Sequence, residues 1–178
     1  MVKNKYKNNS SKSLRFQGII KKLGQLRCYC LNKNVTWGDS TIEFGGYNTD
    51  LSEIGVLVTN KGTLAKGDFD GNGNTTKLIN TEIRLPAALA CRASLDGKGY
   101  LGSLGEWNEV YNNVSEINNM ITKIEGTPLN TNQGDYYWSS TLTNASSMTW
   151  TMPLKHGMII QQPRNIKNAV RVRAFMPL

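Results

Sequence analysis

Cysteine and histidine are scarce in this sequence, which has three cysteines and one histidine among its 178 residues. Cys28 and Cys30 stand too close together to form an ordinary disulfide with each other, which leaves Cys91 alone, so we expect no disulfide framework. The cysteines also lack the paired spacing of a zinc site, and His156 is too little to complete one. We therefore expect no cofactor.

Long apolar stretches are also missing. No run approaches the roughly 18 apolar residues that a membrane-spanning helix needs, so we expect no membrane span. The N-terminus carries positive charge but lacks the apolar core of a secretory signal peptide. We therefore expect a chain that is not exported by that route, or one whose leader has been removed.

Acidic residues are absent before Asp39, where nine of the 21 basic residues lie. The remainder carries 12 basic against 13 acidic residues, although the net charge of the chain is +8. A basic segment rich in Asn and Ser is typical of a solvated arm. Since Tyr6 and Phe16 are its only interleaved aromatics before residue 22, we expect residues 1–34 to be a solubilising or docking arm rather than a nucleic-acid tail.

Residues 35–178 are long enough for one buried core, and we expect a single domain there. Short runs rich in β-formers occur at residues 35–37, 41–44 and 54–58, and Gly and Asp separate them. This pattern predicts strands joined by turns.

Oxygen-bearing side chains then gather around glycines and resemble the first half of a calcium loop. Asp68, Asp70, Asn72 and Asn74 occupy the spacing of its first four ligands, but Ile79 stands where the bidentate Glu is required. These four residues are therefore weak metal candidates. The alternative is an Asx-rich turn, in which the side chains bond their own backbone.

Two helices are expected after this segment. Residues 81–95 have high helix propensity, with Pro86 near the first turn and Cys91 as a small buried hydrophobe. Ser103 and Glu106 have the spacing of a capping box, which predicts the start of a second helix. Its apolar residues recur at steps of three and four and should form one buried stripe: Leu104, Trp107, Val110, Tyr111, Val114, Ile117, Ile121 and Ile124. Whether the helix is broken near residues 112–113 stays open.

Four short β segments are predicted in the C-terminal part, at residues 136–141, 148–152, 158–161 and 169–175. Trp138, Trp150, Val170, Val172 and Phe175 have strand spacing and are expected in the core. Helices followed by strands predict an α+β fold with a small antiparallel terminal β region, because a parallel sheet would need helices between these strands.

The order and spacing of several motifs resemble a known family. The motifs are Gly99 to Trp107, then Tyr137 to Thr141, Trp150, Gly157 and finally Val170 to Phe175. Together they are similar to the C-type-lectin-like, formylglycine-generating-enzyme-like domain of bacterial and bacteriophage surface proteins, including variable proteins of diversity-generating retroelements. The resemblance covers about Gly67 to Leu178. It implies a C-type-lectin-like fold with two main helices, displayed on a phage virion or a bacterial cell surface.

In this family, the exposed positions after the Trp-Ser-Ser motif vary to change the ligand. The resemblance thus implies a ligand-binding surface, and adaptable polar side chains on a rigid scaffold suit the recognition of a protein or glycan on a cell surface. The candidate residues are Thr143, Asn144, Ser146, Ser147, Thr149, Thr151, Lys155, His156, Met158, Gln161, Gln162, Arg164 and Asn165.

Other functions are less well supported by the residues. The enzymes of this fold depend on a pair of late cysteines, whereas this chain has none after Cys91, and no nucleophile motif accompanies His156, so we expect no catalysis. The calcium site of animal lectins is not carried over, because Gln162-Pro163-Arg164 has the proline without a carboxylate. A non-variable decoration protein of a virion or surface appendage stays open as the alternative.

Overall fold

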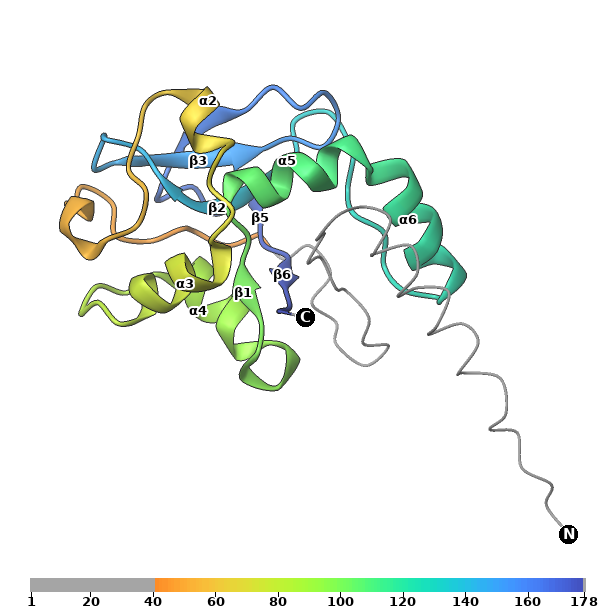
Figure 1. The fold of residues 1–178 in the computed structure, drawn as a ribbon, viewed down its shortest axis with the longest axis horizontal. Coiled ribbons are helices and arrows are strands. Elements are labelled where there is room, and N and C mark those ends of the chain that lie inside the picture. The colour runs from red at the N-terminus through yellow and green to blue at the C-terminus, as the bar shows by residue number, and fades with distance from the viewer. Residues whose placement is uncertain (1–40, 178) are drawn as a thin grey trace, which may run out of the picture.

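In a computed structural model, which describes residues 41–177, the chain forms a mixed α+β fold (Figure 1). The α+β class predicted from the sequence is confirmed. The expected arm, residues 1–34, and the expected strand at residues 35–37 lie outside the described residues. Between residues 41 and 177, no helix has both the length and the apolar character to cross a membrane.

Most helices precede the strands along the chain, and only one short strand comes early. The order is η1 (Ser52–Ile54), α2 (Gly62–Ala65), α3 (Gly71–Ile79), α4 (Pro86–Ala93), η2 (Leu95–Gly97), β1 (Tyr100–Leu101), α5 (Leu104–Asn112), α6 (Val114–Lys123), β2 (Tyr136–Leu142), β3 (Met148–Met152), β4 (Ile160–Pro163), β5 (Val170–Arg171) and β6 (Ala174–Phe175).

The main sheet has four strands in the order β4-β3-β2-β5. β2, β3 and β4 are antiparallel neighbours, as predicted, whereas β5 runs parallel to β2, with Tyr136 opposite Val170. The parallel pair corrects the expectation of a wholly antiparallel region. The chain returns to the start of β2 through β3, β4 and the loop that follows them, and this long connection takes the place of a crossover helix.

A second, two-stranded sheet joins distant parts of the chain. β1 and β6 pair antiparallel, with Tyr100 opposite Phe175 and Leu101 opposite Ala174. The predicted strand at residues 169–175 is therefore divided into β5 and β6, because its two halves pair with different sheets. Arg173, in the break, donates from Nη2 to the carbonyl oxygens of Thr127 at 3.0 Å and Pro128 at 3.2 Å.

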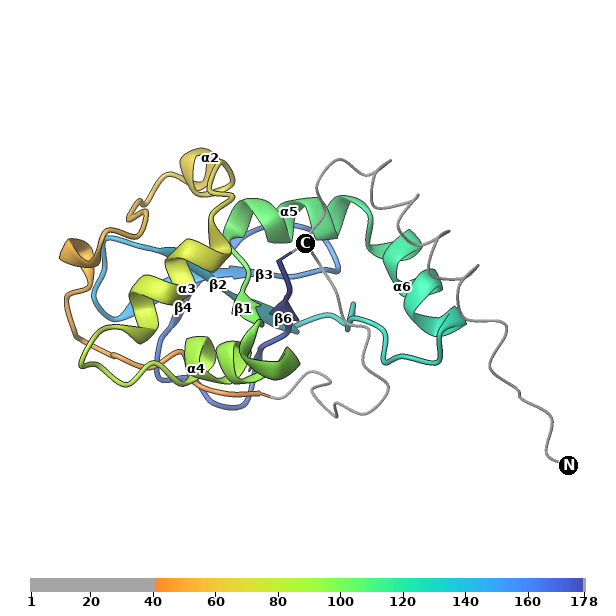
Figure 2. The same cartoon turned by 60° about the horizontal axis from the view of Figure 1, so that its bottom comes forward.

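Apolar cores lie on both faces of the main sheet. Figure 2 shows the strands between α5 on one side and α4 on the other. Successive residues of β2 serve the two cores, since Tyr137 packs in the α5–α6 core with Trp107, and Trp138 packs in the α3–α4 core with Phe44. All five predicted core residues of the C-terminal part are at most 6 % exposed. Because both faces are covered, β2 is buried along nearly its whole length.

The second predicted helix is present but broken. The capping box of Ser103 and Glu106 begins α5, and Asn113 separates α5 from α6. The Asn113 side chain donates to the carbonyl oxygen of Glu109 at 2.9 Å, a local bond of the kind that ends or bends helices. The apolar stripe faces the core as predicted, with Leu104, Trp107, Val110, Ile117 and Ile121 buried. The first predicted helix, residues 81–95, is shorter in the structure, where α4 begins at Pro86 and ends at Ala93; Cys91 is buried in it, as expected.

The local expectations for the segments before α4 were met only in part. Residues 71–79 form the helix α3 rather than a calcium loop, with Asp70 at its N-cap and Leu78 buried below it. The alternative of side chains that bond their own backbone holds just before the helix, where Asp68 Oδ1 accepts from Asp70 N–H at 3.1 Å. Residues 41–44 and 54–58 form only isolated bridges, Thr41 to Arg171 and Val58 to Leu142. Gly45, with a φ of 95°, follows the first stretch, and Gly55, with a φ of 77°, lies within the second. Both glycines turn the chain out of the extended conformation.

Candidate functional site

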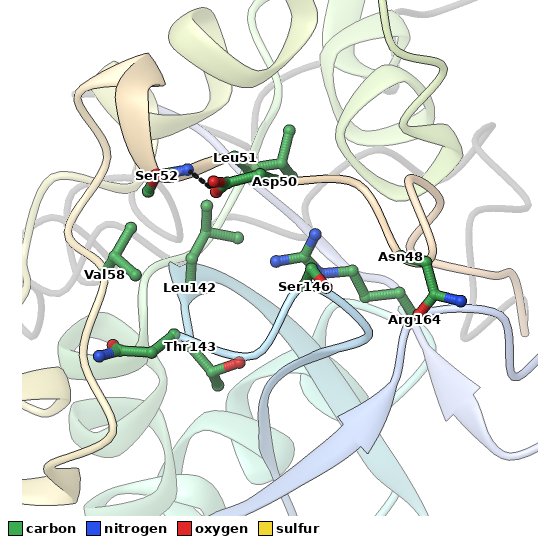
Figure 3. Close-up of a pocket in the computed structure, with 10 residues that line it drawn as sticks. Asn48, Asp50, Leu51, Ser52, Val58, Leu142, Thr143, Ser146 and Arg164 are labelled. Carbon is green, nitrogen blue, oxygen red and sulfur yellow. Dashed lines mark hydrogen bonds between the residues drawn. The ribbon is translucent and has the colours of Figure 1, made fainter.

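A pocket of about 440 Å³ lies where the turn between β2 and β3 meets residues 48–58 (Figure 3). Two segments that are far apart in the sequence supply most of its wall, and Arg164 completes it. The lining residues are Asn48, Asp50, Leu51, Ser52, Val58, Leu142, Thr143, Asn144, Ser146 and Arg164.

The pocket has an apolar base and a polar rim. Leu51 and Leu142 are buried, and Val58 is half-buried beside them. The rim residues are exposed and carry amide, hydroxyl or carboxylate groups: Asn48, Asp50, Ser52, Asn144 and Ser146. A concave apolar surface with a few polar groups around it is the usual form of a small-ligand site.

Backbone hydrogen bonds hold the two walls together. Leu142 N–H donates to the Leu57 carbonyl at 3.0 Å, and Thr59 N–H donates to the Leu142 carbonyl at 3.1 Å. Slightly further on, Asn144 N–H donates to Asn60 Oδ1 at 3.1 Å. The segment that was expected to be a strand thus runs beside the end of β2 and fixes one side of the pocket.

Thr143 shapes the turn from inside rather than facing a ligand. It is buried, and its Oγ1 donates to the Met148 carbonyl at 2.9 Å and to the Ala145 carbonyl at 3.2 Å. These bonds link residues on the two sides of the turn and fix its conformation, so the exposed Asn144 and Ser146 lie on an ordered turn.

Arg164 crosses behind the pocket and is 1 % exposed. Its Nε donates to the Met148 carbonyl at 2.9 Å, and its Nη1 donates to the carbonyls of Thr49 at 3.0 Å and Gly46 at 3.3 Å. The guanidinium carbon also lies 5.7 Å from the centre of the Phe44 ring. Arg164 therefore ties both walls to the sheet.

The charges at the pocket are one cation and one anion. Burial lowers the pKa of Arg164 to about 10, and the nearby charge of Asp50 opposes that shift. The pKa of Asp50 is lowered, first by the hydrogen bond from Ser52 N–H, measured at 2.8 Å, then by the Ser52 side chain, with a smaller contribution from Arg164. Both groups are therefore ionised at neutral pH.

Four of the thirteen predicted ligand-binding residues line this pocket: Thr143, Asn144, Ser146 and Arg164. Ser147 and Asn165 are next to them in the chain, and the Arg164 N–H donates to the Ser147 carbonyl at 2.8 Å. The turn after β2 and the end of β4 are thus brought together.

Two predicted residues are buried within the sheet, which corrects their placement on a binding surface. Thr149 Oγ1 donates to the Thr141 carbonyl at 3.1 Å, and Thr151 Oγ1 donates to the Ile160 carbonyl at 3.0 Å. Their hydroxyl groups bond the backbone of neighbouring chain segments. The alternation that places one face of a strand in solvent fails here, because both faces of β3 are covered.

The remaining predicted residues lie elsewhere on the β3–β4 hairpin. Lys155, His156 and Met158 are exposed on the loop that joins the two strands, at the opposite end from residues 143–147. Gln161 and Gln162 are half-buried on β4, the edge strand. The thirteen residues therefore do not converge on one surface, and the group at the turn after β2 lines the pocket described above.

The weak metal candidates take part in hydrogen bonds instead. The buried Asp68 carboxylate accepts from Thr141 Oγ1 at 2.7 Å, from Asn74 Nδ2 at 2.8 Å and from Asp70 N–H at 3.1 Å. Asp70 accepts from Gly73 N–H at 3.0 Å as the N-cap of α3, and Asn72 Oδ1 is buried without a partner among the described residues. Within residues 41–177, no group of three His, Cys, Asp or Glu side chains is arranged to hold a metal ion.

The sequence did not indicate that residues 48–58 form a wall of the pocket. Asn48, Asp50 and Ser52 follow Gly45 and Gly46 in a stretch that has the composition of an ordinary polar turn. That composition predicts a turn, but no local pattern indicates that this turn lies against residues 142–146.

Neither a family model, nor a curated protein, nor a solved structure matches this chain.

Proposed function

We propose that this chain is a ligand-binding domain and that its site is the pocket between residues 48–58 and the turn after β2. The observation that carries the proposal is the convergence of five exposed polar side chains around an apolar base within a cavity of about 440 Å³. That size lies within the range of about 300–1,000 Å³ that is typical of small-ligand pockets.

The construction of the pocket supports recognition rather than chemistry. Asn and Ser side chains can donate and accept hydrogen bonds, and the scaffold beneath them is fixed by Arg164 and Thr143, which are buried. Adaptable polar groups on a rigid support are the features of binding loops. A protein or glycan of a cell surface, reaching the pocket with one of its groups, is the partner that we propose.

The finer assignment, a C-type-lectin-like variable protein of a diversity-generating retroelement on a phage virion or bacterial surface, is also a proposal. It is supported by the motifs in the sequence and by the order of two consecutive helices, α5 and α6, before the terminal strands. Its test is the neighbouring DNA, which should hold a reverse transcriptase gene and an adenine-rich near-copy of the segment that encodes residues 137–175. Absence of both would overturn the retroelement assignment and leave the pocket untouched.

A binding assay tests the ligand-binding proposal directly. The fluorescently labelled chain is incubated with a panel of whole bacterial cells and with immobilised glycans. A pocket variant, Asn48→Ala with Asn144→Ala and Ser146→Ala, is compared with a matched variant at the other end of the hairpin, Lys155→Ala with His156→Ala. We expect the pocket variant to bind at least about tenfold more weakly, since each lost ligand hydrogen bond is worth about 1 kcal/mol.

The alternative outcomes separate the candidate functions. If only the variant at Lys155 and His156 loses binding, the working surface is the loop between β3 and β4, and the pocket proposal fails. If the chain binds no surface in either panel, the non-variable decoration protein becomes the better description.

A further inference from the structure

The guanidinium of Arg164 has one terminal nitrogen without a protein acceptor in the described part of the chain. Nε and Nη1 donate to three backbone carbonyls, whereas Nη2 forms no hydrogen bond within residues 41–177. Arg164 belongs to the pocket wall, and Figure 3 shows its guanidinium end directed toward the space between Leu142 and Asp50. The free donor thus lies at the pocket.

The positive charge of Arg164 also lacks a direct counter-charge in the region that the structure describes. Among residues 41–177, no carboxylate lies within ion-pair distance of it, and the nearby Asp50 carboxylate accepts from Ser52 N–H instead. Buried charges in proteins are normally paired, because removing an ion from water is costly. The carbonyl dipoles of Gly46, Thr49 and Met148 offset only part of that cost.

We infer that the pocket binds a carboxylate group of its ligand, which pairs with Nη2 of Arg164. An arginine held in place by its other nitrogens loses little side-chain freedom on binding, and a charge-assisted hydrogen bond from its remaining nitrogen to a carboxylate is stronger than a neutral one. The exposed amides of Asn48 and Asn144 at the rim supply further donors. This inference rests on the proposed function, because it names the chemistry recognised by the same pocket.

Asp50 gives the inference a directional test. Its carboxylate shares the pocket and repels a second carboxylate, so Asp50→Asn should strengthen binding of an anion. The exposed side chain can still accept from Ser52 N–H after the change, and folding should be preserved. Misfolding cannot produce tighter binding, which makes this variant more decisive than removal of the buried Arg164.

The experiment is a titration of the ¹⁵N-labelled full chain followed by NMR. The probes are two matched pairs: N-acetylalanine with its neutral amide, which represents a peptide terminus, and glucuronate with glucose, which represents an acidic sugar. At neutral pH we expect the carboxylate of at least one pair to bind about tenfold or more tightly than its neutral partner, with shifts at Asn48, Asn144 and the Nε–H of Arg164. The pair that responds identifies the source of the carboxylate.

We expect the same carboxylate to bind about two- to fivefold more tightly to Asp50→Asn, a modest gain because solvent weakens the repulsion from an exposed charge. The control is Asp96→Asn, which removes an exposed acid outside the pocket and should leave binding unchanged. Equal or weaker binding in Asp50→Asn would overturn the inference. Equal binding of neutral and charged probes would overturn it too, while the pocket would remain a binding site. If no probe shifts the pocket resonances, the inference fails, and the cell-surface assay decides the proposed function by itself.

Discussion

At the scale of single residues, Glu106 both caps the start of α5 and forms a buried hydrogen bond inside the domain. As the third helical residue of α5, it accepts from Ser103 N–H at 2.9 Å in the capping box. The same carboxylate also accepts from Tyr100 Oη at 3.1 Å and is only 8 % exposed. A helix cap of this kind usually lies in solvent, whereas this one is inside the domain and near Asp68.

Burial raises the pKa of Glu106 above its ordinary value of 4.5, and the charge of Asp68 adds to the shift, while the bonds from Ser103 and Tyr100 oppose it. A carboxyl whose pKa is higher in the folded state stabilises the fold while it is protonated. That stabilisation is complete below the pKa of the unfolded chain and is lost as the pH rises through the folded pKa.

We therefore predict a pH-dependent difference between the wild type and Glu106→Gln, which cannot titrate. The free energy of unfolding of the wild type, relative to that of the variant, should fall as the pH rises above 4.5 and through the raised pKa of the folded state. Urea denaturation at several pH values measures this difference. Parallel curves for the two proteins would show that the carboxyl has the same pKa in the folded and unfolded states.

At the scale of the element, the β3–β4 hairpin is anchored at both ends. Arg164 and Thr143 hold the end at the pocket. At the other end, Gly157 has a φ of 66° and a Cβ built on it would lie 2.3 Å from the Tyr111 ring of α5. Both the backbone conformation and the close approach to α5 favour glycine there.

We predict that Gly157→Ala destabilises the protein more than Gly134→Ala. Gly134 has a similar φ of 84°, but a Cβ added to it would meet no atom within 4 Å, so its replacement measures the backbone cost alone. That cost should be about 1 kcal/mol of unfolding free energy, and Gly157→Ala should reach about 2 kcal/mol because Tyr111 must also move. Chemical denaturation gives both values. Equal losses would mean that Tyr111 yields at no cost.

At the scale of the whole molecule, the last strand closes the fold. β6 pairs with β1, and Phe175 lies 4.9 Å from Trp107 and 5.7 Å from Tyr100, measured between ring centres. Gly102 leaves room for the Phe175 ring, because a Cβ there would lie 2.5 Å from it. Residues near the end of the chain thus complete the core that α5 begins.

We predict that Phe175→Ala lowers the free energy of unfolding by about 3–5 kcal/mol, since it leaves a cavity beside the rings of Trp107 and Tyr100. The half-buried neighbour offers a control, and Met176→Ala should lower it by clearly less. Thermal or urea denaturation monitored by tryptophan fluorescence measures both. A loss for Phe175→Ala no larger than that of the control would show that β6 does not close the core.

The sequence alone determined the parts of the molecule that depend on local pattern. The stripe from Leu104 to Ile121, the capping box at Ser103 and the cores of β2 and β3 follow from periodicity and capping chemistry, which act over a few residues. The α+β class follows from the order of those segments. The composition of residues 41–44 and 54–58 alone predicts strands, but a glycine with positive φ follows the first stretch at residue 45 and lies within the second at residue 55.

Only the tertiary structure decided which polar residues are free to bind. Thr149 and Thr151 have the composition of a binding surface, but both faces of the sheet are covered and their hydroxyl groups bond the backbone. Arg164 is also buried, and backbone carbonyls hold its Nε and Nη1, so that only Nη2 is left as a donor at the pocket among the described residues. The opposite wall of the pocket comes from residues 48–58, whose position depends on long-range hydrogen bonds to Leu142. No local pattern encodes such contacts, because they form between segments that meet only when the chain is folded.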